Sequence, residues 1–326
     1  MLRLPARCVR PHGLLPRACV LLALAVLALV ETPAPARAAE PDYSGYQALL
    51  TRYVQVLPRK KGEPWDARFD YEQLFIDEKI WQGGRAERLT NIQTQLLAVT
   101  PSAMSARERT AWALNSYNFL AIEHMTRNLL VPGRRYQRYD SPKQVRGDEG
   151  TFFAAPVAHL NGVAYSLTGF ERRFVYGDSA TIPLADGLQP REVGGDPRLQ
   201  FGLTKAALCG GLVMPWVFRA DSLEAQLDRA VRFALASPRW IRVDEATASF
   251  MASNRFFDER VDLGGADMPG LMPLITKYGP QKLQQLIKSK KLTKPTMFFE
   301  PDWRLNQFDH PAPPLPGAMK DSTKKG

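Results

Sequence analysis

The sequence predicts an α+β fold that is mainly helical and contains a small antiparallel sheet. Two observations indicate this. Apolar residues recur at three- and four-residue spacing through most of residues 43–132, which is the period of amphipathic helices. Residues 157–167 instead alternate on either side of Asn161-Gly162, a pair that favours the tight turn of a β-hairpin. The chain of 326 residues is long enough to bury a sizeable core.

Four helices are expected in the N-terminal part. Three of them cover residues 43–57, 70–81 and 85–99. The fourth begins at Ser105, where Ser105 and Glu108 have the spacing of a capping box, in which each side chain satisfies a free backbone N–H group. Glu123 and Arg127 lie four residues apart, so their ion pair favours continuation of this helix to about Leu130.

The rest of the chain alternates between strand, loop and helix signals. After the hairpin, Thr168 and Glu171 have the spacing of a second capping box, before a short helix over residues 170–177. Residues 178–197 are rich in turn formers and are expected to form a surface loop. The later elements are a helix over residues 223–237, a strand with a turn over 240–250, and a final helix over 277–291.

The N-terminus has the pattern of a secretory signal. Basic residues precede an apolar run over residues 18–30, and small residues suited to cleavage follow at 36–38. We expect residues 1–38 to be a cleaved signal peptide; the alternative is an uncleaved membrane anchor. The mature protein is then exported, either secreted or periplasmic in a bacterial cell envelope. Residues 39–308 are expected to form a single globular domain, and the Pro/Lys-rich residues 309–326 a disordered tail.

Charge and cysteine content limit the classes of function. The formal charge is +10, and loss of five basic residues and one acidic residue with the signal leaves +6. Basic runs such as residues 287–294 are typical of solvated faces, or of attraction to anionic envelope polymers. A nucleic-acid ligand does not suit an exported protein. Cys8 and Cys19 leave with the signal, so Cys209 remains alone and no internal disulfide is expected.

No cofactor is expected from the sequence. It contains no His-x-x-x-His pattern and no paired cysteines, so no metal site is predicted. The two Gly-Gly pairs lack the remainder of a phosphate-binding loop.

Several stretches, in order, resemble the family catalogued as domain of unknown function 547. They are Asn115-Ser-Tyr-Asn118 on the long helix, residues 166–177, Asp196-Pro197-Arg198, and residues 302–306. The resemblance covers about residues 43–306. It implies a relationship to papain-like or transglutaminase-like cysteine hydrolases.

The chain departs from that family where catalysis would be expected. Gln200 stands where the family usually has histidine, and Arg172 likewise replaces a frequent histidine. Other residues occupy the neighbourhood where cysteines and a serine are usual, namely Lys205, Ala207 and Gly210. Cys209 matches the family's cysteine only if the alignment is shifted. The resemblance therefore implies a scaffold that has lost its catalytic groups.

Cys209 has two interpretations. A nucleophilic cysteine needs a helix N-terminus, a nearby cation or an imidazole. If residues 203–208 form a helical turn, Cys209 lies at its C-terminal end, where the helix dipole raises the pKa of a thiol. His124 falls on the opposite side of its helix from Asn115, and His310 begins the tail, so His159 is the remaining candidate base. The alternatives are a Cys209–His159 catalytic pair and a small buried side chain.

Five further residues are candidates for ligand binding. Asn115 and Asn118 share a helix face and either hold the backbone near residues 196–198 or orient a ligand's amide. Arg198 either binds a ligand carboxylate or forms an internal salt bridge with Glu171 or Asp262. Gln200 and Glu171 complete the predicted cleft.

The leading hypothesis is an exported envelope protein, catalytically degenerate, that binds a small peptide-like or carboxylate ligand in this cleft. The alternative is a cysteine hydrolase or acyl transferase that uses Cys209 and His159. A third hypothesis is a structural partner in an envelope complex. No nucleic-acid partner is expected, and no stable membrane span is expected once the signal is removed.

Overall fold

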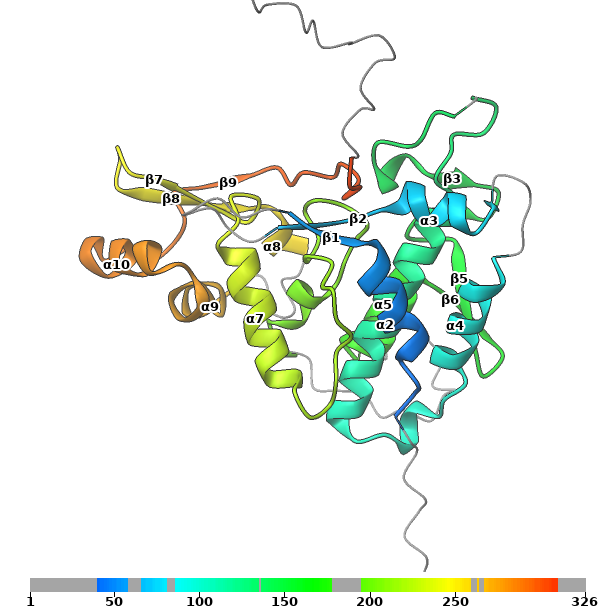
Figure 1. The fold of residues 1–326 in the computed structure, drawn as a ribbon. Coiled ribbons are helices and arrows are strands. Elements are labelled where there is room, and N and C mark those ends of the chain that lie inside the picture. The colour runs from blue at the N-terminus through cyan, green and yellow to red at the C-terminus, as the bar shows by residue number, and fades with distance from the viewer. Residues whose placement is uncertain are drawn as a thin grey trace, which may run out of the picture. The chain divides into compact units, whose positions relative to one another are not determined.

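The computed structural model describes residues 40–57, 66–80, 86–134, 136–177, 195–258, 263 and 267–309. All of these residues belong to one compact unit, Ala38–Gly326. Helices and small sheets alternate along them, which confirms the predicted α+β class (Figure 1). The expected signal, most of the expected loop at 178–197 and the expected tail from residue 310 lie outside the described residues.

The elements have the following bounds. The α-helices are α2 (Ser44–Tyr53), α3 (Tyr71–Asp77), α4 (Glu87–Leu97), α5 (Ala106–Arg127), α6 (Leu167–Phe170), α7 (Leu223–Leu235), α8 (Arg255–Asp258), α9 (Leu271–Tyr278) and α10 (Gln281–Lys290). Short 3₁₀ helices in the described part of the chain include η2 (Pro101–Ala103), η3 (Pro142–Gln144) and η5 (Leu199–Gly202), and η4 (Glu171–Val175) is a π-helical turn. The strands are β1 (Val54–Val56), β2 (Ala67–Phe69), β3 (Arg146–Gly147), β4 (Gly150–Thr151), β5 (Pro156–Leu160), β6 (Val163–Ser166), β7 (Ile241–Asp244), β8 (Ser249–Ser253) and β9 (Met297–Phe299).

Helix α5 is the central helix of the N-terminal part. Its capping box forms as predicted, because Ser105 Oγ accepts from the Glu108 N–H and the Glu108 carboxylate accepts from the Ser105 N–H. The Glu123–Arg127 pair also forms. Apolar side chains are buried around most of its circumference, as expected for a helix inside a core. Helices α3 and α4 and the π-helical turn η4 pack against it, and Figure 1 shows α2 nearby.

The sheets are small, with two or three strands each among the described residues. Strands β5 and β6 form the predicted hairpin, with Asn161 and Gly162 at φ values of 52° and 79°. Strands β7 and β8 are antiparallel, and β9 adds to β8 in the parallel direction. The three-stranded sheet is therefore mixed, because the chain passes through α9 and α10 before it returns to the sheet.

Four local predictions were wrong. The final helix begins at Gln281 rather than at residue 277, because Gly279 and Pro280 separate it from α9, which ends at Tyr278. The first helix ends at Tyr53, because Val54–Val56 pairs with Ala67–Phe69 as strand β1. The helix after the hairpin is capped by Ser166, whose Oγ accepts from the Gly169 N–H, rather than by Thr168. Residues 203–208 form no helical turn, and the 3₁₀ helix η5 lies just before them.

Two hydrophobic clusters make up the core of the described residues. The first lies among α2 to α6, the β5–β6 hairpin and the start of α7, which contributes Leu223 and Leu227. The second lies among the rest of α7, α9, α10 and the β7–β8 strands. Residues 199–218, here called the buried segment, contribute to both. Leu203 and Val213 belong to the first cluster, whereas Phe201 and Met214 belong to the second.

Candidate functional site

The buried segment contains the motif region on which the functional hypotheses rest. Residues 199–214 are buried without interruption, although little of this stretch is regular structure. An irregular chain in a core needs partners for its backbone N–H and C=O groups, because leaving such groups unpaired away from water costs free energy.

Amide side chains from three helices, α2, α5 and α7, supply many of these partners. Asn118 accepts from the Thr204 N–H at 2.8 Å and donates to the Gly202 carbonyl at 2.7 Å. Asn115 accepts from the Phe218 N–H and donates to the Phe218 carbonyl, both at 2.8 Å. Gln47 of α2 likewise makes two bonds to the segment's backbone, at Pro215 and Val217. Gln226 of α7 donates to the Val217 carbonyl and accepts from the N–H of Arg219, which directly follows the segment.

Both asparagines hold loop backbone, as one of their two interpretations proposed, but at Gly202, Thr204 and Phe218 rather than near residues 196–198. Each amide uses both its oxygen and its nitrogen on backbone groups. A cavity of about 10 Å³ lies beside them, which is room for about one water molecule. Both amide groups are occupied by backbone, and the cavity beside them has no room for a ligand larger than a water molecule.

Cys209 is completely buried within this segment. Burial raises the pKa of its thiol to about 11, and the positive charge of Arg255 offsets this only in part. At neutral pH only about one thiol in 10⁴ would be the thiolate, which is the nucleophilic form. The environment thus suits a small apolar side chain.

His159 lies in a different setting. It is exposed on β5, where it lines a shallow groove together with Gln93 and Thr94 of α4. No hydrogen bond joins His159 to Cys209 within the described residues. His124 is mostly buried against Phe152, and burial lowers its pKa to about 4.

Glu171 and Gln200 are both buried beside the segment. Glu171 forms a buried ion pair with Lys205, whose ammonium group lies 5.0 Å from the centre of the Tyr117 ring. Gln200 donates to the Pro197 carbonyl at 3.1 Å. Its Oε1 atom is buried and has no hydrogen-bond partner among the described residues.

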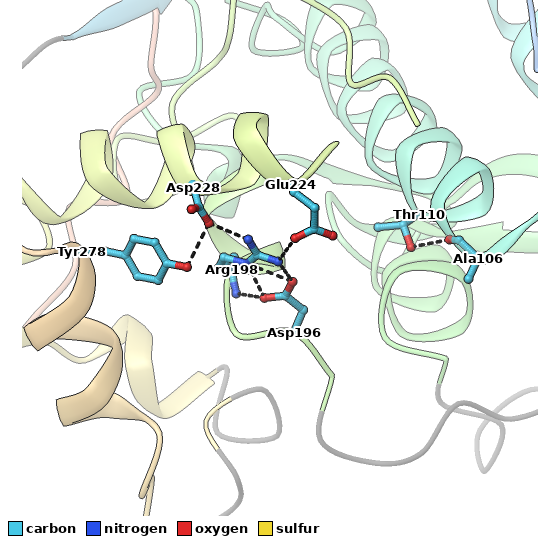
Figure 2. A network of polar contacts seen from close by, with 7 residues as sticks. All are labelled: Ala106, Thr110, Asp196, Arg198, Glu224, Asp228 and Tyr278. Carbon is cyan, nitrogen blue, oxygen red and sulfur yellow. Dashed lines mark hydrogen bonds and ion pairs between the residues drawn. The ribbon is translucent and has the colours of Figure 1, made fainter. Parts of the chain in front are cut away.

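Arg198 is the centre of a network of acidic side chains (Figure 2). Its guanidinium binds Asp196 through two nitrogens, Glu224 at 2.6 Å and Asp228 at 2.5 Å. Asp228 also accepts from the Tyr278 hydroxyl at 2.9 Å. Hydrogen bonds to Asp196 are the largest of the contacts that raise the pKa of Arg198 above its ordinary value.

The predicted salt bridge of Arg198 to Glu171 was wrong, because Glu171 pairs with Lys205 instead. The other predicted partner, Asp262, lies outside the described residues. Sequence reasoning missed Glu224 and Asp228 as partners. They are four residues apart on α7 and therefore share a helix face. This spacing was the sequence pattern that could have predicted a paired acidic site for an arginine.

Two general features of the described residues bear on function. The described residues contain no group of three or more histidine, cysteine or acidic residues placed to hold a metal ion. Among the helices described here, none is long and apolar enough to cross a membrane.

Comparison with family models, with curated proteins and with solved structures finds no match to this chain. The family resemblance therefore stays a prediction.

Proposed function

We propose that this chain is an exported envelope protein without catalytic activity that binds a small peptide-like or carboxylate ligand. The observation on which the proposal rests is the closed environment of Cys209, which has no exposed surface and a thiol pKa raised to about 11. A sulfur atom in this setting neither meets a substrate nor ionises readily.

The residues around the motif support the same conclusion. Asn115 and Asn118 hold backbone, Glu171 is paired with Lys205, and Arg198 is bound by three carboxylates. These side chains build a rigid frame for the buried segment. A ligand would then bind beside this frame and contact side chains that the frame leaves unpaired.

Alkylation of Cys209 tests the proposal. The native protein is treated with iodoacetamide between pH 6 and 9, and the peptide that contains Cys209 is followed by mass spectrometry. We expect labelling at pH 7 to be at least about 100-fold slower than for a free cysteine, since both access and thiolate fraction are low. Denaturant should remove the difference.

The competing hypothesis is a cysteine hydrolase or acyl transferase. It requires rapid labelling near pH 6 and turnover of amide or thioester substrates that Cys209→Ser abolishes. Either result would refute the proposal. Cys209→Ala is the matched variant, and under our proposal it leaves ligand binding unchanged.

A further inference from the structure

A groove of about 260 Å³ lies beside the Arg198 network. The first turns of α5 and α7 form its two sides, with Asp196 and Leu199 between them. In Figure 2, Glu224 and Asp196 lie on the side of Arg198 that faces Ala106 and Thr110 of α5. The groove is thus separate from Cys209 and next to the acidic network.

The α5 side of the groove has a positive charge. Arg107 lies in the first turn of α5 and is exposed. No ion pair or hydrogen bond occupies its guanidinium within the part of the chain that the structure describes. The N-terminus of this long helix adds to the positive potential. A guanidinium in such a place can bind a carboxylate through two parallel hydrogen bonds.

The α7 side has a negative charge. One guanidinium, Arg198, binds three carboxylates, so the network keeps a net charge of about −2. The Oε2 atom of Glu224 accepts a hydrogen bond from Arg198, whereas its Oε1 atom has no partner in the described structure. The Glu224 side chain is 55% exposed. Glu224 can therefore accept a hydrogen bond from a cationic ligand without releasing Arg198.

Apolar surface lies between the two charged sides. Leu199, Leu223 and Leu227 line the groove and leave little of their own surface exposed. The volume is slightly below the range of about 300–1,000 Å³ that is usual for small-molecule sites. The ligand must therefore be small, with an apolar part between two charged ends.

We infer that this groove binds a free amino acid or a dipeptide through both of its charged ends. Arg107 holds the ligand carboxylate, Glu224 together with Asp196 holds the ammonium group, and the leucines contact the apolar side chain. This inference rests on the proposed function and assigns its ligand class and its site. Arg198 is a positioning residue, because it orients Glu224 and Asp196 without contacting the ligand.

The dipeptide leucyl-leucine is the probe, and titration calorimetry measures its binding to the purified protein. Two blocked forms are compared with it, N-acetyl-leucyl-leucine, which lacks the ammonium group, and leucyl-leucine amide, which lacks the carboxylate. We expect each blocked form to bind at least about 10-fold more weakly, since each loses one charged hydrogen-bonded contact.

Two variants test the assignment of each end. Arg107→Gln should weaken leucyl-leucine binding by about 10-fold or more, and the amide form should then bind that variant as well as the free dipeptide does. Glu224→Gln should also weaken leucyl-leucine binding by about 10-fold or more, and the acetylated form should then bind that variant as well as the free dipeptide does. The matched controls are Arg109→Gln, two residues along the same helix, and Glu87→Gln, in the first turn of α4; both should bind within about 2-fold of the wild type.

Two outcomes would refute the groove assignment, and a third would refute the proposed function. If the dipeptide fails to bind at about 10 mM, or binds with no dependence on Arg107 and Glu224, the groove assignment is wrong. The proposed function would still stand in that case, provided that Cys209 remains inert. Hydrolysis of the same peptides that depends on Cys209 would instead refute the proposed function. Thermal unfolding of each variant shows that the fold is retained.

Discussion

Asn118 shows how one polar side chain can hold an irregular stretch of core. It contributes one acceptor and one donor, and both bind backbone groups of the buried segment. The sequence placed Asn115 and Asn118 on one face of a helix, and this was sufficient to expect loop backbone as their partner. Which backbone groups they bind depends on residues 84 and 86 positions farther along the chain for Asn118, and 103 positions farther for Asn115.

Asn118→Ala should therefore lower the free energy of unfolding by about 2–4 kcal/mol, since the Gly202 carbonyl and the Thr204 N–H lose their partner inside the core. Urea denaturation measures this change. Asn128→Ala is the control, because Asn128 is only partly buried at the end of α5, and it should cost less than about 1 kcal/mol. Equal effects of the two changes would contradict the structural role assigned to Asn118.

His124 gives a pH-dependent prediction. Burial lowers its pKa from 6.5 to about 4 in the folded protein. The unfolded chain therefore binds a proton that the folded protein does not bind between these two values. The stability associated with neutral His124 is fully present above pH 6.5 and falls, by at most about 3 kcal/mol, as the pH decreases to 4.

The variant His124→Phe should remove this part of the pH dependence, because phenylalanine retains the aromatic contact with Phe152. Urea denaturation at pH 7 and at pH 4.5 measures the slope in each protein. His159→Ala is the matched control, since His159 is exposed on β5. If the slopes of wild type and His124→Phe coincide, His124 does not titrate as described.

At the scale of elements, the sequence was most informative where the signal is local. The capping box at Ser105 and the Asn161-Gly162 turn were both predicted and both form. Strand β1 was missed because Val54–Val56 continues a helical pattern, and only pairing with β2 makes it extended. A short helix was predicted over residues 170–177, where η4 forms, but its π-helical geometry was not predicted. The irregular path of the buried segment was also missed, because its backbone geometry depends on distant partners.

Gly211 shows how closely the buried segment is packed. A Cβ atom at this position would lie 2.3 Å from the Phe201 carbonyl oxygen and 3.0 Å from that of Leu203. Both neighbours are backbone atoms, which cannot rotate away. Gly211→Ala should therefore destabilise the protein by at least about 3 kcal/mol.

Thermal unfolding tests this prediction, with Gly147→Ala as the control. Gly147 lies on exposed strand β3, and a Cβ atom there would meet no atom within 4 Å. The control should change stability by less than about 0.5 kcal/mol. A tolerated Gly211→Ala would mean that the segment is more loosely packed than the structure shows.

At the scale of the whole described molecule, the buried segment joins two hydrophobic clusters. Phe201 packs with Trp240 and Phe256 in the second cluster, whereas Leu203 belongs to the first. Because the buried segment contributes side chains to both clusters, we expect the opening of one cluster to expose part of the other.

Unfolding should therefore be cooperative across both clusters. Native-state hydrogen exchange measures this directly, because the slowest amides of α5 report on the first cluster and those of β8 on the second. We expect both sets to exchange with the same free energy, equal to that of global unfolding. A lower value for β8 alone would show that the second cluster opens independently.

The sequence by itself determined the α+β class, the course of α5, the hairpin and the pair of asparagines on one helix face, because period, caps and turn residues act over a few positions. Only the tertiary structure decided what the candidate residues do. In the folded chain Cys209 is buried and His159 is exposed. Glu171 pairs with Lys205, 34 positions away, and Arg198 pairs with three carboxylates. Those outcomes depend on which distant groups share a low-dielectric interior, and no local pattern specifies that.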